Sequence, residues 1–107
     1  MRALLVITNA PDRAVAEKIA RHLVEARLAA CVNILAGCES VYRLQGAVES
    51  ASEVPLLIET QESRFEAVQE AIRKLHPYEL PEVVAVTIDR GLPQYLQWLA
   101  AESAPAG

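Results

Sequence analysis

Hydrophobic residues along the chain fall into strand-like runs and helix-like stripes. A continuous apolar run at residues 4–7 is typical of a strand buried on both faces, and residues 83–88 predict the last strand. Between them, apolar residues three or four positions apart predict two amphipathic helices, whose stripes are Val15, Ile19, Leu23 and Ala26, then Phe65, Val68, Ile72 and Leu75. Ser63 and Glu66 form a capping box that predicts the start of the second helix, which ends at His76.

The region between the two helices predicts one long hairpin. Residues 30–44 have strand character, Gln45-Gly46 suits a turn, and residues 47–61 form the returning arm. Each arm has about fifteen residues, against about 5–6 in a usual strand. The hairpin must therefore extend beyond its own sheet, where pairing with another subunit covers the exposed backbone groups. Pro55 conflicts with a central position in the returning strand, because it removes a ladder donor.

The order of elements is strand-helix-strand twice, followed by a short helix over residues 92–101. This order predicts an α+β fold, a ferredoxin-like βαββαβ sandwich with a C-terminal helix and a long hairpin between its second and third strands. Residues 1–102 are predicted to form a single domain, and the small residues 103–107 to form a flexible tail.

Composition narrows the classes of function. The chain has 107 residues, 52% of them hydrophobic, and a net charge of −4, which argues against a nucleic-acid partner. No apolar run approaches the roughly 18 residues of a membrane span. The first residues do not resemble a secretory signal, so we predict a cytoplasmic protein. Cys31 and Cys38 are then predicted to be thiols.

Residues 76–82 concentrate the polar chemistry. Pro77 and Pro81 restrict the backbone, so the polar groups between and around them are held in place. His76, Glu79 and Glu82 are donors that could bind a borderline divalent metal or a small polar ligand. We predict a functional pocket here.

Cys31 and Cys38 allow alternative interpretations of the chemistry of this chain. A nucleophile pair of Cys31 with His76 competes with a packing role for Cys31, whose small apolar neighbours favour packing. Cys31 and Cys38 lie seven residues apart, on opposite faces of a regular strand, although a bulge at Gly37 restores one face and allows a joint soft-metal site. The sequence contains no phosphate-binding loop and no catalytic signature.

Four motifs in chain order resemble the divalent-cation tolerance proteins, the CutA family. They are Leu28-Ala29-Ala30-Cys31-Val32-Asn33, Tyr42 with Gln45-Gly46, residues 76–82, and Tyr95-Leu96-Gln97-Trp98-Leu99. The resemblance implies a non-enzymatic homotrimer, joined through its hairpins and associated with tolerance to copper and other divalent metals. It also implies a pocket between subunits, lined by Cys31, Tyr42, His76, Tyr78, Glu79, Glu82 and Trp98.

The chain departs from the family pattern at four positions. By resemblance, some copper-binding members use a cysteine at the place of Thr8 and a histidine pair ending at His76, where this chain has Leu75 before His76. The family usually shows an aromatic residue, often Trp, where this chain has Leu44, and a Lys where it has Glu59. The expected ligand is Cu(II) or another divalent cation, which folding does not require. A PII-like trimeric sensor with a small ligand in its intersubunit pocket, or a structural trimer scaffold, is the alternative.

Overall fold

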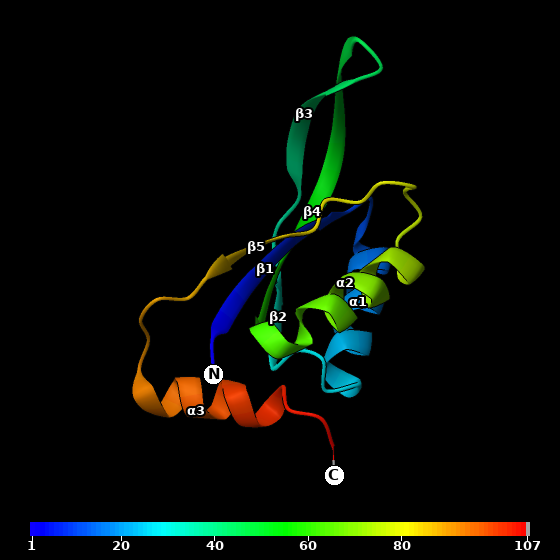
Figure 1. Ribbon diagram of the computed structural model, residues 1–107. Helices are drawn as coiled ribbons and strands as arrows, with labels where there is room; N and C mark the ends of the chain where they lie inside the picture. The colour runs from blue at the N-terminus through cyan, green and yellow to red at the C-terminus, as the bar shows by residue number, and fades with distance from the viewer. Residues whose placement is uncertain (107) are drawn as a thin grey trace.

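The computed structural model describes residues 1–106. In chain order the elements are β1 (Ala3–Ala10), α1 (Arg13–Glu25), β2 (Cys31–Ile34), β3 (Cys38–Leu44), β4 (Ala47–Gln61), the 3-10 turn Glu62–Arg64, α2 (Phe65–Leu75), β5 (Val84–Thr87) and α3 (Pro93–Glu102) (Figure 1). None of the helices in this range is long and apolar enough to cross a membrane.

The sheet is antiparallel and has the order β2-β4-β1-β5, which confirms the predicted ferredoxin-like α+β fold. β1 pairs with β4 along all eight of its residues. β4 is 15 residues long, and only its second half belongs to this sheet. Its first half pairs with β3 alone, from Cys38 opposite Glu53 to Leu44 opposite Ala47.

α1 and α2 pack against one face of the sheet and form the main core (Figure 1). The predicted helix stripes supply most of that core, with Ile19, Leu23 and Ile72 fully buried. Ala26, assigned to the first stripe, instead lies after the end of α1 and is exposed. Two buried threonines on this face satisfy their hydroxyls: Thr8 donates to the Glu82 carbonyl and Thr60 to the Leu28 carbonyl. No unpaired hydroxyl is therefore left in the core at either position.

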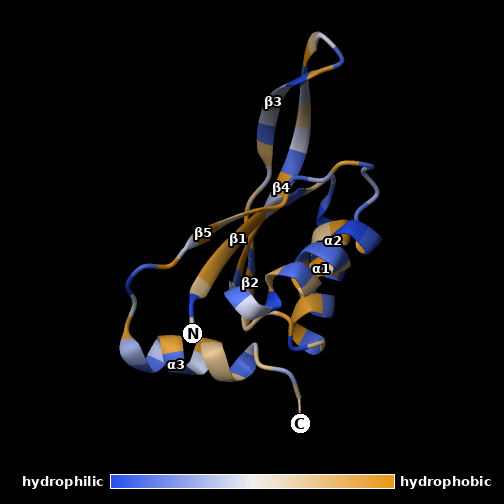
Figure 2. Ribbon diagram, in the orientation of Figure 1, coloured by the Kyte–Doolittle hydropathy of each residue, from blue (hydrophilic) through white to orange (hydrophobic). Residues whose placement is uncertain are grey.

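The opposite face of the sheet is covered at one end only. There α3 places Leu99 on Ala3 and Ala30. The rest of this face, which we call the open face, carries five apolar side chains: Leu5, Ile7, Leu57, Val84 and Val86. Val84 and Val86 are 49% and 52% exposed, and the strands that bear these residues are strongly apolar (Figure 2).

The β3–β4 hairpin projects beyond the body of the molecule, as predicted (Figure 1). Its turn residues Gln45 and Gly46 both have positive φ, the pattern of a tight two-residue hairpin turn. Pro55 fits because it lies between the part of β4 that pairs with β2 and the part that pairs with β3. The Pro55 carbonyl accepts the Leu35 N–H. Proline has no N–H to donate, but β2 ends at Ile34, before this position, so no hydrogen bond of the β2 ladder is lost.

The predicted capping box of the second helix is wrong. The chain enters α2 through a 3-10 turn that contains Ser63, so Arg64 occupies the N-cap position and no side chain caps the helix. Ser63 therefore lacks the extended backbone that a capping serine needs. In α1, by contrast, Asp12 is extended and its carboxylate accepts the Val15 N–H at 2.9 Å.

The start of the predicted flexible tail is docked on the domain. Ser103 is fully buried and donates to the Leu99 carbonyl. The Ala104 carbonyl accepts a hydrogen bond from Arg27. Gly107, the last residue of that tail, lies outside the described residues.

Candidate functional site

His76 follows the last residue of α2 and is only 6% exposed. Pro77 keeps its backbone extended, which ends the helix and turns the ring toward β1. Its Nε2 donates to the Asn9 carbonyl at 2.6 Å, and its Nδ1 accepts the Tyr78 N–H at 3.1 Å. Because a carbonyl can only accept and a backbone N–H can only donate, the ring is the neutral Nε2–H tautomer. Neither ring nitrogen keeps a free lone pair for a metal.

The end of β1 also holds the far end of the 76–82 segment. The Thr8 hydroxyl donates to the Glu82 carbonyl at 2.6 Å, and the Asn9 amide donates to the Glu82 carboxylate at 3.0 Å. Asn9 thus contacts both ends of the segment, through its backbone at His76 and through its side chain at Glu82. The segment is fixed to the sheet, as its prolines suggested.

Tyr78 lies where this segment meets the base of the hairpin. Its ring packs on His76, with the ring centroids 4.6 Å apart. Burial raises the pKa of Tyr78, and the neighbouring Glu53 carboxylate and Tyr42 raise it further. Four residues, Tyr42, Glu53, His76 and Tyr78, therefore form one group, which we call the Tyr78 cluster.

A second group lies near α3 and consists of Cys31, Glu59, Tyr95 and Trp98, which we call the Glu59 cluster. Cys31 is directly opposite Glu59 in the pairing of β2 with β4. The Tyr95 hydroxyl donates to the Glu59 carboxylate at 2.5 Å. The Tyr95 and Trp98 rings are 5.3 Å apart between centroids, at an interplanar angle of 39°.

The Glu59 carboxylate contributes to the raised pKa values of Tyr95 and Cys31. Its hydrogen bond with Tyr95, followed by burial and by its negative charge, raises the pKa of Tyr95 to about 12. Burial and then the charge of Glu59 raise the pKa of the Cys31 thiol, while the nearby Tyr95 hydroxyl acts in the opposite direction. At neutral pH both groups are therefore protonated.

The two clusters are far apart within one chain. Glu53 and Glu59 lie six residues apart on β4, and at about 3.3 Å per residue this is about 20 Å. The predicted pocket residues Tyr42, His76 and Tyr78 thus lie at one end of the sheet, and Cys31 and Trp98 at the other. Cys38 lies opposite Glu53 and Cys31 opposite Glu59, so the alternative of a joint thiol site is wrong for a single chain.

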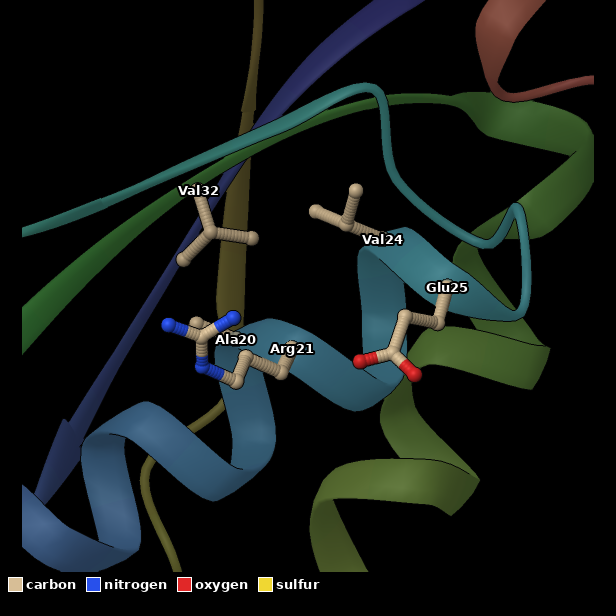
Figure 3. A pocket seen from close by; sticks show the side chains of 5 residues that line it. All are labelled: Ala20, Arg21, Val24, Glu25 and Val32. Carbon is tan, nitrogen blue, oxygen red and sulfur yellow. The ribbon is translucent and has the colours of Figure 1, made fainter.

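The structure describes two shallow grooves elsewhere. One, of about 260 Å³, lies between α1 and β2 and contains none of the predicted site residues (Figure 3); it is lined by Ala20, Arg21, Val24, Glu25 and Val32. The other, of about 230 Å³, runs along α2 and takes in Glu79; its remaining lining residues are Gln69, Arg73, Leu80, Pro81 and Val83. Glu79 thus lies beside the helix, away from Cys31 and Trp98.

The donors of a single chain do not fit a metal site. Within residues 1–106, no three His, Cys, Asp or Glu side chains come together as metal ligands. Both nitrogens of His76 and one carboxylate oxygen of Glu82 are already hydrogen-bonded. Both cysteines are free thiols, as predicted.

Three residues of these clusters were not predicted as site residues: Glu53, Glu59 and Tyr95. Neither was Asn9, which holds both ends of the 76–82 segment. The spacing of Tyr95, three positions before Trp98 on a helix, places the two side chains on one helix face and could have identified it. Glu53 and Glu59 share strand parity and therefore one face of β4. No sequence signal pointed to Asn9, because its backbone carbonyl makes the contact with His76.

Comparison with known proteins gives a consistent assignment. The family model of the CutA1 divalent ion tolerance protein matches residues 4–102. The divalent-cation tolerance protein CutA of Thermus thermophilus is 46% identical over 95 residues, which cover 89% of this chain and 92% of that protein. Mouse protein CutA is 46% identical over 89 residues, 83% of this chain, and the match spans only 50% of the mouse protein.

The fold agrees with the sequence comparison. A solved structure of the divalent cation tolerance protein from Thermus thermophilus superposes with a TM-score of 0.94 at 43% identity, and covers 95% of this chain and 99% of that one. The order of the strands, the length of the hairpin and four motifs in sequence therefore point the same way. This chain belongs to the CutA1 family of divalent ion tolerance proteins.

Proposed function

We propose that this protein acts as a homotrimeric divalent-cation tolerance protein, which responds to metal ions and catalyses no reaction. The relatives named as divalent-cation tolerance proteins support the role. The apolar surface that a single chain leaves exposed supports the trimeric assembly. We place the protein in the cytoplasm, where its free thiols stay reduced.

A single chain has more surface than a compact monomer needs. Its accessible surface is 6740 Å², whereas about 5,900 Å² is expected for a monomer of its mass. Its radius of gyration is 14.3 Å, against about 13 Å for a compact domain of this length. The excess lies in the projecting hairpin, which contributes no core of its own.

The hairpin exposes several large apolar side chains. Val41 and Val48 are each 67% exposed and Leu44 is 54% exposed. By strand register Leu44 lies on the side of the open face, whereas Val41 and Val48 lie on the other side of the hairpin. Large apolar side chains exposed on both sides of the hairpin and on the open face indicate an interface. The outer edges of β2 and β5 also have no strand partner within the described chain. Packing each hairpin on the next subunit covers both the apolar residues and the strand edges.

Copper(II), or another divalent cation, is the ligand that we assign to this role. Because one chain does not bring three donors together, we propose that donors from two subunits complete the site, with Glu79 and Glu82 as oxygen donors. His76 joins them only if it gives up its bond to Asn9 or to Tyr78. The Thr8 hydroxyl is engaged with Glu82 and is not free to bind metal.

Calorimetric titration of metal-stripped protein with Cu(II) and Zn(II) tests the proposed role. We expect binding in a simple ratio to the subunit, and loss of that binding when Glu79→Gln and Glu82→Gln are combined. Glu66→Gln, which removes an exposed carboxylate on α2, is the matched control and should bind normally. Absence of saturable heat with either metal would contradict the metal-binding part of the proposal.

A further inference from the structure

Glu59 is a half-buried carboxylate without a cationic partner. It lies in the middle of the sheet, between Leu5 of β1 and Cys31 of β2. One of its oxygens accepts the Tyr95 hydroxyl. Among residues 1–106, every ion pair uses a different acid, and the Glu59 carboxylate accepts no second hydrogen bond; the Ala30 N–H donates to its backbone carbonyl. A charge withdrawn from water in this way is normally paired.

Two aromatic rings lie beside this carboxylate and face outward. Tyr95 and Trp98 are three positions apart on α3 and are 41% and 42% exposed. Their centroids are 5.3 Å apart. The faces of such rings attract organic cations, and Trp does so most strongly. The carboxylate and the rings therefore favour the same kind of ligand.

The chemistry of the cluster argues for an organic cation over a metal ion. The thiol of Cys31 and the phenol of Tyr95 both stay protonated at neutral pH, because Glu59 and burial raise the pKa of each. Glu59 is then the one charged donor of the cluster, too few for a divalent metal. The aromatic carbon atoms of Tyr95 and Trp98 can pack against the apolar surface of an ammonium or guanidinium ligand.

We propose that Glu59, Tyr95 and Trp98 form a binding site for the cationic end of a small organic molecule, an ammonium or guanidinium group. The free carboxylate oxygen accepts its N–H donors, and the two rings cover its apolar surface. The site goes beyond metal tolerance and does not depend on it.

The test uses the fluorescence of Trp98, which is the chain's one tryptophan. The intact protein is titrated with n-butylammonium and n-butylguanidinium chloride, in the presence of a chelator. n-Butyrate, n-butanol and sodium chloride at matched ionic strength serve as comparison ligands. We expect a saturable change with the two cations only. Glu59→Gln should weaken that binding at least tenfold, and Glu59→Lys should reverse the preference toward n-butyrate.

Glu66→Gln is the matched control. Glu66 is an exposed carboxylate on α2, which packs on the other face of the sheet from Glu59. It should bind both cations as the wild type does. A response to n-butanol equal to that of the cations, or unchanged cation affinity in Glu59→Gln, overturns the proposal. Dissociation of the assembly in Glu59→Gln also overturns the proposal, because the carboxylate would then stabilise contacts with another subunit. Because these titrations contain a chelator, their outcome is independent of the calorimetric test of metal binding.

Discussion

Replacement of His76 by alanine should destabilise the protein even when no metal is present. The ring is 6% exposed and makes two hydrogen bonds, to the Asn9 carbonyl and from the Tyr78 N–H. At about 1 kcal/mol for each bond, the free energy of unfolding should fall by about 2 kcal/mol. The cavity left by the ring adds to this loss.

The assay is denaturant unfolding of chelator-treated protein, with wild type and variant at one fixed concentration because association also contributes to stability. A loss of about 2 kcal/mol corresponds to a fall in Tm of about 8 °C for a domain of this size. Glu79→Ala is the control, because Glu79 is exposed and adjacent in sequence. Equal midpoints for His76→Ala and wild type would refute the bonding assigned to the ring. They would favour a histidine held free for a ligand.

Three further predictions follow from the described contacts. Arg27 binds the Ala101 and Ala104 carbonyls at the end of α3, so Arg27→Ala should lower stability by about 1–2 kcal/mol and speed hydrogen exchange in α3; unchanged exchange would contradict this. Asp12→Ala should cost about 1 kcal/mol by removing the cap of α1, whereas Ser63→Ala should cost almost nothing, as denaturant midpoints will show. The pKa of Tyr95 is raised to about 12 by its bond to Glu59, by burial and by the charge of that carboxylate. The stability gained from this bond is therefore complete below about pH 10, the pKa in the unfolded chain, and is lost as the pH rises through about 12. Ultraviolet titration should show this phenol ionising earlier in Glu59→Gln.

The sequence predicted the fold well because periodicity and turn chemistry are local. The stripes of both helices became the core, with Val68 and Ile72 fully buried. The Gln45-Gly46 turn and the length of the arms were enough to predict the overhanging hairpin. The capping box failed because Ser63 and Glu66 have the right spacing in sequence, while the chain approaches α2 through a 3-10 turn.

The candidate site was only partly predictable, because its geometry depends on long-range register. The resemblance grouped Cys31 and Trp98 with Tyr78 in a pocket between subunits, and within one chain β4 holds them at opposite ends of the sheet. The direction of the His76 ring depends on a backbone carbonyl 67 positions away in sequence. No residue type in the sequence indicates such a backbone contact. Spacing alone therefore could not distinguish a metal ligand from a histidine that fixes the segment to β1.

The mass of the protein in solution is the most direct test of the account. Light scattering over a dilution series should give about 35 kDa, three times the 11.7 kDa of one chain. The double variant Leu44→Glu and Val86→Glu, which places charge on the hairpin and on the open face, should lower that mass. Glu66→Gln, on α2 and outside both surfaces, should leave it unchanged. A wild-type mass of one chain across the series would contradict the claim that the open face and the hairpin are buried between subunits.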